Sequence, residues 1–406
     1  MRWFPEGLLW AWTGLAVSWR IIADLLVRSA SPAVSMPDPS HLPSLTVFKP
    51  LPPLAGASVS EELRLSLESF LRQGRQGVEI LIGVPEEDME TWAPLLNEWK
   101  EKYLSLSLGV LGKCEGNLPN PKIDKLRRLA RLAKGELWLW SDADIVAPEG
   151  FLDGLRREWL DRGCALTCPY VIRRNVSGAG WLDALFIDLE FFPGALLLAR
   201  QPAVDFCFGA GTLFAASDFQ ERADWARLGS TLADDHQLGK EIGPVGISRW
   251  IVETWPERRG WRSAFEHFWR WQKTVLWVQP AGYAAQILIW PVLGWAAWAL
   301  CRPHEPRAWI GWAAAVLAQS VIGALTLRRI GIGGGNLQSV AALPAWFALR
   351  PWAWALSWLP APVRWTGARP RWSGLTQPSA VGDQQSVHGS AAHRTHLSRS
   401  GLKADS

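Results

Sequence analysis

The amino-acid sequence predicts an α/β fold, a parallel sheet with helices on both faces, joined to segments that lie in a membrane. Two observations lead to this fold class. Between residues 45 and 260, short apolar stretches alternate with stretches of helical spacing, as in a parallel sheet covered by helices. Near both ends the chain contains long apolar stretches, and the one beyond residue 260 is rich in tryptophan.

The strands are expected where apolar residues cluster in short runs. These runs cover residues 45–48, 78–84, 104–111, 136–141 and about 164–171. Helical spacing fills the gaps between them at 60–73, 90–102 and 122–133. Parallel sheets bind their ligands beyond the carboxyl ends of the strands. Site residues are therefore expected directly after the strands.

The first segment, residues 1–28, is expected to be an uncleaved membrane anchor. It is mostly apolar, although Arg20 and Asp24 fall inside it. A cleaved signal peptide is the alternative, but no charged start and small-residue cleavage site are clear. Residues 29–44 are rich in proline and serine and indicate a linker to the domain at 45–260.

Residues 261–360 are expected to form an interfacial helix and transmembrane helices. Sixteen of the 28 tryptophans lie between residues 250 and 365, and tryptophan favours the boundary between lipid and water. Residues 308–327 carry no charge and are long enough to cross a bilayer as a helix. Arg328 and Arg329 follow at once, as a cytoplasmic flank would.

Two further apolar stretches in this region contain prolines. Residues 275–300 are uncharged but are split by Pro280 and Pro291. Residues 339–360 are interrupted by Pro344, Arg350 and Pro351, so a re-entrant or interfacial segment is as well supported as a span. The tail at 361–406 lacks apolar periodicity and is expected to be disordered.

Composition limits the class of protein. The net charge is +4 and the pI is about 8.9, without long basic runs, which argues against a dedicated nucleic-acid binder. The five cysteines are odd in number and stand at no metal-binding spacing. We therefore expect buried reduced thiols and a domain that faces the cytosol.

Two acidic residues directly follow the strand predicted at 136–141. Asp142 and Asp144 stand one residue apart, and like charges at that distance repel each other. A shared divalent cation, Mg²⁺ or Mn²⁺, would remove this repulsion and keep positions open for phosphate oxygens. The alternative is a solvated turn.

A second acidic pair stands in the segment "STLADDHQLGKEI". Asp234 and Asp235 are expected at the start of a helix, where a carboxylate is stabilised as an anion and can accept a proton. A helix cap is the alternative. Further on, Arg270 and Trp271 begin the segment next to the membrane, where Arg270 would either grip a pyrophosphate or serve as an interfacial anchor.

Taken in order, these motifs resemble those of membrane-bound glycosyltransferases of families 2 and 21, close to ceramide glucosyltransferases and bacterial hopanoid-associated relatives. The resemblance covers about residues 45–300. It is carried by "VFKPL" (47–51), "PNPKIDKL" (119–126), "SDADI" (141–145), "FCFGAGTLFAAS" (206–217), "LADDHQLGKEI" (232–242) and "HFWRW" (267–271).

The resemblance implies a GT-A-type, Rossmann-like domain that binds a nucleotide sugar, with an N-terminal anchor and C-terminal transmembrane helices. It implies that Asp142 and Asp144 hold the metal and that Asp235 is the general base. Nucleotide-sugar contacts are implied for Lys49, Asp88, Asn120, Lys122, Asp142, Arg270 and Trp271. Asp88 in "GVPEEDM" is the nearest match to an acidic residue that contacts uracil or ribose, with Glu87 as the alternative. His267 stands where the family carries Gln or Arg, and Asp234 stands where it more usually carries Glu.

The implied activity is the inverting transfer of glucose or N-acetylglucosamine from a UDP-sugar to the hydroxyl of a membrane lipid of ceramide or hopanoid type. The expected location is a multi-pass membrane protein with a cytosolic catalytic domain and no nucleic-acid partner. Two alternatives of other kinds remain open. One is a processive polysaccharide synthase, and the other is a non-catalytic membrane scaffold.

Overall fold

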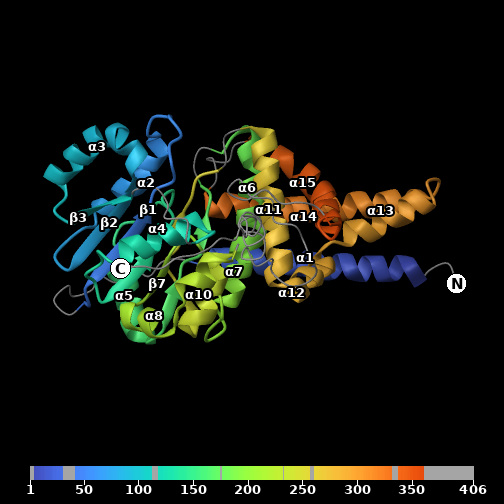
Figure 1. The fold of residues 1–406 in the computed structure, drawn as a ribbon. Helices are drawn as coiled ribbons and strands as arrows, with labels where there is room; N and C mark the ends of the chain where they lie inside the picture. The colour runs from blue at the N-terminus through green and yellow to red at the C-terminus, as the bar shows by residue number, and fades with distance from the viewer. Residues whose placement is uncertain are drawn as a thin grey trace, which may run out of the picture.

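The fold is described from a computed structural model, for residues 4–30, 42–111, 118–173, 176–231, 233–256, 260–331 and 337–360. Most of the predicted linker at 29–44 and the whole predicted tail at 361–406 lie outside these described residues. The sheet domain lies at one end of the molecule, and long helices project from it at the other (Figure 1).

A seven-stranded sheet with the order β3-β2-β1-β4-β7-β5-β8 forms the centre of the domain. Its strands are β1 Leu45–Pro50, β2 Val78–Pro85, β3 Leu106–Leu111, β4 Leu137–Trp140, β5 Ala165–Thr167, β7 Thr212–Ala215 and β8 Val245–Ile247. The first four strands pair in parallel, as predicted. The α/β class is therefore confirmed.

Helices cover both faces of this sheet because successive side chains of a strand point to opposite sides. On β1, Val47 belongs to the core beneath α2 Glu61–Leu71, α3 Met89–Lys102 and α5 Phe151–Arg162. Its neighbour Phe48 belongs to the core beneath α4 Pro121–Ala130, α8 Ala216–Arg222, α9 Trp225–Gly229 and α10 Asp234–Ile242.

One strand departs from the predicted parallel order. β7 runs antiparallel to both β4 and β5. The chain reaches β7 after a long helical excursion, and it enters the sheet from the edge at which β4 ends. As a result, the loop that precedes β7 lies beside the carboxyl end of β4, where site residues are expected.

The prediction of a single strand near 164–171 was wrong. The stretch divides at Pro169, which has no N–H to donate to a ladder. Its first part is β5 in the main sheet, and its second part is β6 Tyr170–Val171, which pairs in parallel with β9 Val252–Glu253 in a separate two-stranded sheet. This change of sheet carries Tyr170 out of the β5 register.

The helical excursion between β6 and β7 contains a π-helical turn. After the short η3 Gly178–Gly180, the segment consists of α6 Trp181–Phe186, the π-helix η4 Ile187–Phe191 and α7 Phe192–Leu198. The buried Asp188 accepts a hydrogen bond from the backbone N–H of Ile172 at 2.9 Å, which fixes the turn to the end of β6. Such turns are frequent at functional sites.

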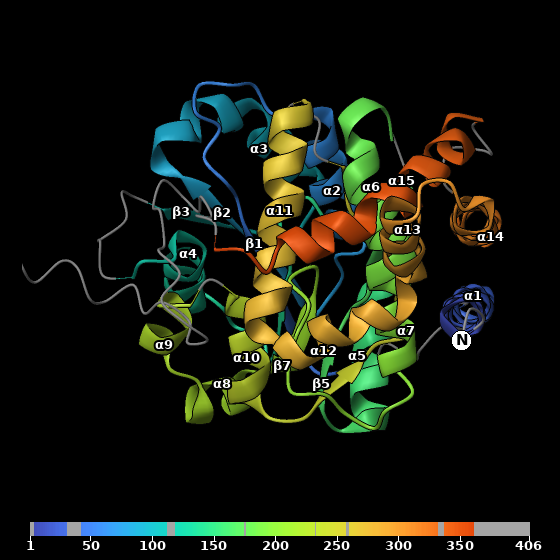
Figure 2. The ribbon, with the colours of Figure 1, turned by 90° about the vertical axis from the view of Figure 1, so that its right-hand side faces the viewer.

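Six further helical segments follow in the part of the chain that the structure describes. They are α11 Trp261–Val278, α12 Pro280–Ala285, η5 Gln286–Ile289, α13 Pro291–Cys301, α14 Pro306–Ile330 and α15 Leu337–Leu356. α11 stands beside the sheet domain, and the end of α15 lies across α11 (Figure 2). The ε-amino group of Lys273 on α11 donates to the backbone carbonyls of Ser357 and Leu359, directly after α15, and so ties the two helices together.

Two of the described helices are long and apolar enough to cross a membrane. They are Glu6–Ser29, within α1 Phe4–Ser29, and α14. A third crossing arises if the pair Pro280–Ile289 and Pro291–Cys301, bent by 62°, is one span. Proline at residue 291 accounts for the bend. Within the described residues, α15 is not among these candidates.

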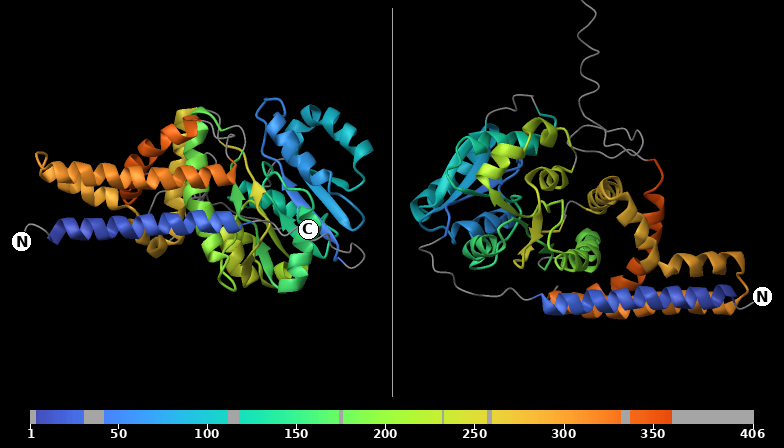
Figure 3. Two further views of the ribbon diagram at one scale, coloured as in Figure 1. Left: turned by 180° about the vertical axis from the view of Figure 1, so that it is seen from behind. Right: turned by 90° about the horizontal axis from the view of Figure 1, so that it is seen from below.

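The two candidate spans run parallel to each other, as Figure 3 shows. Glu6 and Arg307 pair at one end at 3.6 Å, and Asp24 accepts from Arg329 Nε at 2.8 Å at the other. The charge of Asp24, which weakened the expectation of an anchor, is therefore matched by a partner on α14.

Candidate active site

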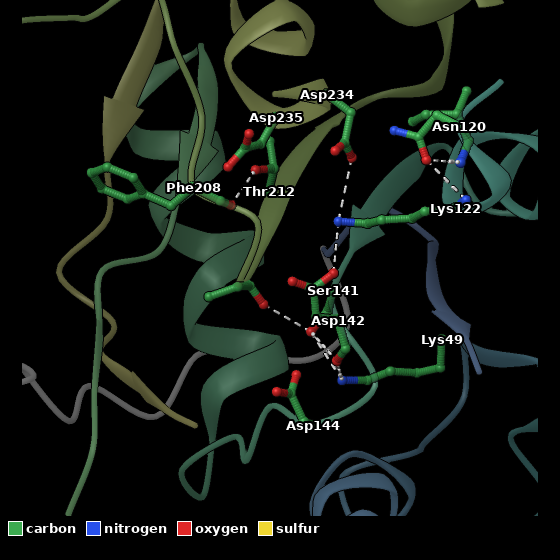
Figure 4. Close-up of polar contacts among 12 residues, drawn as sticks. Lys49, Asn120, Lys122, Ser141, Asp142, Asp144, Phe208, Thr212, Asp234 and Asp235 are labelled. Atoms are coloured by element: carbon green, nitrogen blue, oxygen red, sulfur yellow. Dashed lines mark hydrogen bonds and ion pairs between the residues drawn. The ribbon is translucent and has the colours of Figure 1, made fainter. Parts of the chain in front are cut away.

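The candidate site begins at the carboxyl end of β4, near the middle of the sheet. Ser141 fixes the start of the turn, because its hydroxyl donates to the carbonyl of Ala210 at 2.9 Å. The same hydroxyl accepts from Lys49 Nζ at 2.9 Å, and Lys49 also donates to the carbonyl of Asp142 at 2.9 Å (Figure 4). The turn that carries the acidic pair is thus held from β1 and from the loop before β7.

Lys49 itself is completely buried, with its ammonium 3.5 Å from the centre of the Phe70 ring. Burial lowers the pKa of Lys49 to about 7, against the opposing effect of Asp144 and Asp142. In this structure the side chain holds the turn after β4 from beneath. The nucleotide contact expected for Lys49 stays a prediction.

Asp142 and Asp144 differ in their surroundings. Asp142 is half-buried beside Lys122, whereas Asp144 reaches the surface and accepts from Thr254 Oγ1 at 3.2 Å. The protein around Asp144 nevertheless removes part of its hydration, and this effect, together with the charge of Asp142, raises the pKa of Asp144 above its ordinary value. A positive charge next to Asp142 and Asp144 would therefore stabilise both carboxylates.

The start of α4 supplies that charge. Asn120 caps the helix by accepting from the backbone N–H groups of Lys122 and Ile123, with Pro121 at the first helical position. Lys122 Nζ lies 2.7 Å from Asp142 Oδ1 and 3.4 Å from Asp234 Oδ2. Burial alone would lower the pKa of Lys122, but Asp142 and Asp234 outweigh it and raise the pKa above its ordinary value.

The second acidic pair opens α10, as the sequence predicted. Its two side chains take different directions (Figure 4). Asp234 reaches Lys122, whereas Asp235 lies toward the loop before β7 and accepts from the backbone N–H of His236 at 2.9 Å. Burial and the charge of Asp234 raise the pKa of Asp235 to about 6.

Gly209, in the loop before β7, separates the two acidic pairs. A β-carbon built on Gly209 would lie 3.1 Å from Asp142 Oδ2, 3.6 Å from Asp235 Oδ2 and 3.7 Å from Lys122 Nζ. The space that a larger residue would fill is part of a small cavity. It is lined by Pro50, Lys122, Leu126, Trp140, Ser141, Phe208, Gly209, Thr212, Asp234, Asp235 and Leu238.

The loop before β7 is fixed in place by the sheet. The backbone N–H of Phe208 donates to Thr167 Oγ1 at 2.7 Å, and the Thr212 hydroxyl donates to the Phe208 carbonyl at 3.2 Å. The backbone N–H of Cys207 donates to the carbonyl of Asp235 at 3.3 Å. These bonds fix the positions of Gly209 and Asp235 relative to each other.

Four aromatic side chains, here called the aromatic wall, continue from the cavity toward α11. They are Tyr170, Phe191, Phe208 and Trp271. Phe191 is central. The centre of its ring lies 4.5 Å from the ring centre of Tyr170, 4.9 Å from that of Phe208 and 6.4 Å from that of Trp271. Burial, followed by the charges of Asp235 and Asp142, raises the pKa of Tyr170 well above its usual value. The wall therefore connects the acidic residues to the helix beside the membrane segments.

The chain is similar to a known protein family over most of its length. The family model for glycosyl transferase family 21 matches residues 8–373, which is nearly the whole chain. The chain belongs to glycosyl transferase family 21. Family membership makes it a nucleotide-sugar glycosyltransferase, and, with the sheet described above, confirms the GT-A-type fold.

Solved structures give weaker likenesses. The mannosyltransferase PcManGT from Pyrobaculum calidifontis, in complex with GDP-Man and Mn²⁺, is 17% identical, with a TM-score of 0.43 over 87% of this chain and 96% of that chain. TarS from S. aureus is 10% identical, with a TM-score of 0.36 over 75% and 55% of the two chains. GalNAc-T7 with UDP, GalNAc and Mn²⁺ is 13% identical, with a TM-score of 0.38 over 55% and 45%. No curated protein matched the family 21 chain.

The donor atoms of this site suit a hard divalent cation. Asp142 and Asp144 offer carboxylate oxygens, the ligand type that Mg²⁺ and Mn²⁺ prefer. Among the described residues, no group of three or more His, Cys, Asp or Glu side chains lies close enough to hold a metal. A cation at Asp142 and Asp144 would thus take its remaining ligands from a bound diphosphate and water.

The other residues singled out from the sequence lie around this centre. Asp88, at the end of η2 Glu86–Asp88 after β2, is buried and accepts from the backbone N–H of Leu54 at 2.8 Å. Trp271 belongs to the aromatic wall, and Arg270 precedes it on α11. The roles expected for Asp88, Arg270 and Trp271 stay predictions.

Several residues of the site escaped the sequence analysis. Gly209, Phe208 and Thr212 belong to the motif "FCFGAGTLFAAS", but no local feature of that motif singles them out. Tyr170 and Phe191 lie in segments without any motif, and only the split at Pro169 and the π-helical turn bring them into the aromatic wall next to Phe208. Of the cysteines expected to be buried, Cys168 and Cys207 are buried, Cys164 is half-buried and Cys301 is exposed, while Cys114 lies outside the described residues.

Proposed function

We propose that this family 21 enzyme is an inverting glycosyltransferase that moves glucose or N-acetylglucosamine from a UDP-sugar to the hydroxyl of a membrane lipid of ceramide or hopanoid type. The observation that carries the proposal is that Gly209, which lines the cavity together with Asp235, also lies next to Asp142: a β-carbon on Gly209 would lie 3.1 Å from Asp142 Oδ2 and 3.6 Å from Asp235 Oδ2. A donor held near Asp142 and an acceptor held near Asp235 would meet in that space.

Asp235 is the proposed general base. A pKa of about 6 leaves its carboxylate mostly ionised at neutral pH and more basic than an ordinary aspartate. It would take the proton from the acceptor hydroxyl as that oxygen attacks the anomeric carbon. With one base and no protein nucleophile assigned, a single displacement follows, and the product is β-linked.

Asp142 and Asp144 are proposed to hold Mg²⁺ or Mn²⁺. When bound, the cation would neutralise the charge that develops on the departing UDP. Lys122 is placed to add a second positive charge to the same diphosphate, because its ammonium already lies against Asp142. The remaining donor contacts are assigned to Lys49, Asp88, Asn120, Arg270 and Trp271, on the resemblance described above.

The membrane helices support a lipid as the acceptor. Glu190, in the π-helical turn, accepts from Arg350 of α15, whose side chain is fully buried. The next residue, Phe191, is the centre of the aromatic wall. The helices next to the candidate spans thus connect to the cavity through Phe191 and Phe208, so a lipid headgroup could enter while its chains stay in the bilayer. A multi-pass topology with a cytosolic sheet domain agrees with Arg328 and Arg329 at the end of α14.

The proposal is tested by incubating membranes that contain the full-length chain with UDP-glucose or UDP-N-acetylglucosamine and with ceramide or a hopanoid lipid. We expect a β-linked glycolipid of the corresponding mass. A water-soluble polymer that grows with time would support the polysaccharide synthase instead. Absence of transfer with every pair, in a chain that still binds UDP, would overturn the lipid proposal.

A further inference from the structure

A chain of two hydrogen bonds links α6 to the aromatic wall through α11. His267 Nδ1 lies 3.0 Å from Asp183 Oδ1, and Trp271 Nε1 lies 3.0 Å from His267 Nε2. Asp183 is buried and its carboxylate faces away from water, whereas about a quarter of the His267 side chain is exposed, 27%. The contact between residues 183 and 267 joins elements that are far apart in the sequence.

The chemistry of the three side chains fixes the direction of both bonds. An indole N–H can only donate, so His267 Nε2 must accept from Trp271 and cannot carry a proton. The proton of the neutral imidazole must then lie on Nδ1, where it donates to Asp183. The imidazole is therefore held in one tautomer and one orientation, and it offers neither nitrogen to a diphosphate.

Trp271 connects His267 and Asp183 to the other rings of the aromatic wall. Its ring centre lies 6.1 Å from Phe186, 6.4 Å from Tyr170 and 6.4 Å from Phe191. Phe191 in turn contacts Phe208, which lines the cavity together with Asp235. A rotation of the indole would therefore shift the surface that faces the proposed base.

We infer that His267 is a positioning residue, which holds Trp271 in place through its Nδ1-protonated tautomer and so shapes the acceptor side of the cavity. This inference rests on the proposed function. His267 acts through Trp271 and takes no part in binding the donor.

The first test compares three variants of the full-length protein with UDP-glucose and ceramide in mixed micelles. Gln in His267→Gln can still accept from Trp271 with its oxygen and donate to Asp183 with its nitrogen, so it should retain activity. His267→Met fills similar space but makes neither bond, and it should raise the KM for ceramide about fivefold, the effect expected from loss of the one bond that holds Trp271. Because Trp271 is also assigned a donor contact, the KM for UDP-glucose should rise no more than the KM for ceramide. Glu266→Gln, on the exposed side of α11 beside Arg262, is the control and should behave as the parent.

A double-mutant cycle separates the hydrogen bond from simple packing. Trp271→Phe keeps an aromatic ring but loses the N–H, so its effect should match that of His267→Met. The double variant should be no worse than either single one, because both remove the same bond. Additive effects, or a rise in the KM for UDP-glucose alone, would overturn the inference.

A second test does not depend on the substrate. The chain has 7 histidines, so the imidazole ¹⁵N resonances of His267 can be found as the pair missing from His267→Gln in labelled full-length protein in nanodiscs. At pH 7.5 we expect a protonated Nδ1 and an unprotonated Nε2. The opposite tautomer would overturn the inference whatever the substrate, whereas a parent chain that makes no glycolipid would overturn only the proposed function.

Discussion

The ammonium of Lys122 lies 2.7 Å from the carboxylate of Asp142, the residue expected to hold a divalent cation. A cation that binds to Asp142 in the absence of nucleotide must compete with this ion pair. Once a diphosphate is present, the same ammonium would have a new anionic partner and would help to hold it. Lys122 should therefore oppose the binding of metal alone and favour the binding of nucleotide.

Lys122→Gln tests this double role. We expect Mn²⁺ alone to bind more tightly and UDP in the presence of Mn²⁺ to bind about tenfold more weakly, because one close charge pair with phosphate is lost. Isothermal titration calorimetry of the full-length protein measures both. Lys134→Gln removes an equal charge at an exposed position beside Glu79 and should change neither affinity. Unchanged binding in both variants would show that Lys122 only orders the free site.

Asp144→Asn tests the metal site from its exposed side. The substitution removes one ligand charge, so Mn²⁺-dependent UDP binding should weaken about tenfold or more. The fold should stay intact, since the described contact of the side chain is one hydrogen bond from Thr254. Calorimetry and a thermal unfolding curve give the two quantities. Equal metal and UDP affinities in Asp144→Asn and the parent would indicate a surface turn.

The sequence was most informative where local pattern determines position. The end of β4 could be located because "LWLW" is apolar and Asp142 follows at once, and the start of α10 could be located at Asp234 from its acidic first turn. Asp142 could also be placed at the ligand-binding edge of the sheet because it directly follows a parallel strand, whereas Asp234 could be placed only at the start of a helix. Four of the five predicted strands and all three predicted helices of the sheet domain lie close to their predicted ranges.

The remainder depends on contacts between distant segments. Nothing near β7 reveals that it runs antiparallel, because its direction depends on where the preceding excursion ends. The link between Asp183 and His267 spans 84 residues and has no local signal. His267 was expected only as a departure from a motif, and its partner could not be named before the fold was known.

Gly209→Ala tests whether the space between the acidic pairs is needed. The added methyl group would lie 3.1 Å from Asp142 Oδ2, so the carboxylates or the substrates must move. A displacement of this kind should lower kcat about 10- to 100-fold with little change in thermal stability. Gly211→Ala is the control in the same loop, because the nearest neighbours of its methyl group would be Cys168 and Leu139, at 3.6 Å or more. Similar rates in Gly209→Ala and Gly211→Ala would indicate that the reaction takes place outside this cavity.

The raised pKa of Asp235 predicts the acid side of the pH profile. Burial and Asp234 raise the pKa to about 6, so the carboxylate becomes protonated as the pH falls through that value and can no longer accept a proton. Transfer should therefore decline below about pH 6, and a bound divalent cation should shift this decline to lower pH. The residual activity of Asp235→Asn should show no such decline. If the activity of Asp235→Asn still declined below about pH 6 as in the parent, the decline would be caused by another titrating group.

The mechanism depends on which of Asp234 and Asp235 is the general base. Asp234 points to Lys122 at 3.4 Å, whereas Asp235 lies beside Gly209 in the space where donor and acceptor would meet. Removal of a general base typically costs about 10²–10⁴-fold in rate, while binding of the UDP-sugar needs no proton transfer. Asp235→Asn should thus lose most of the transfer and keep its affinity for the donor, measured by initial rates and by calorimetry. Asp234→Asn should retain measurable turnover, because it loses only a contact to Lys122. Full activity in Asp235→Asn, or a loss confined to Asp234→Asn, would show that the other carboxylate is the base.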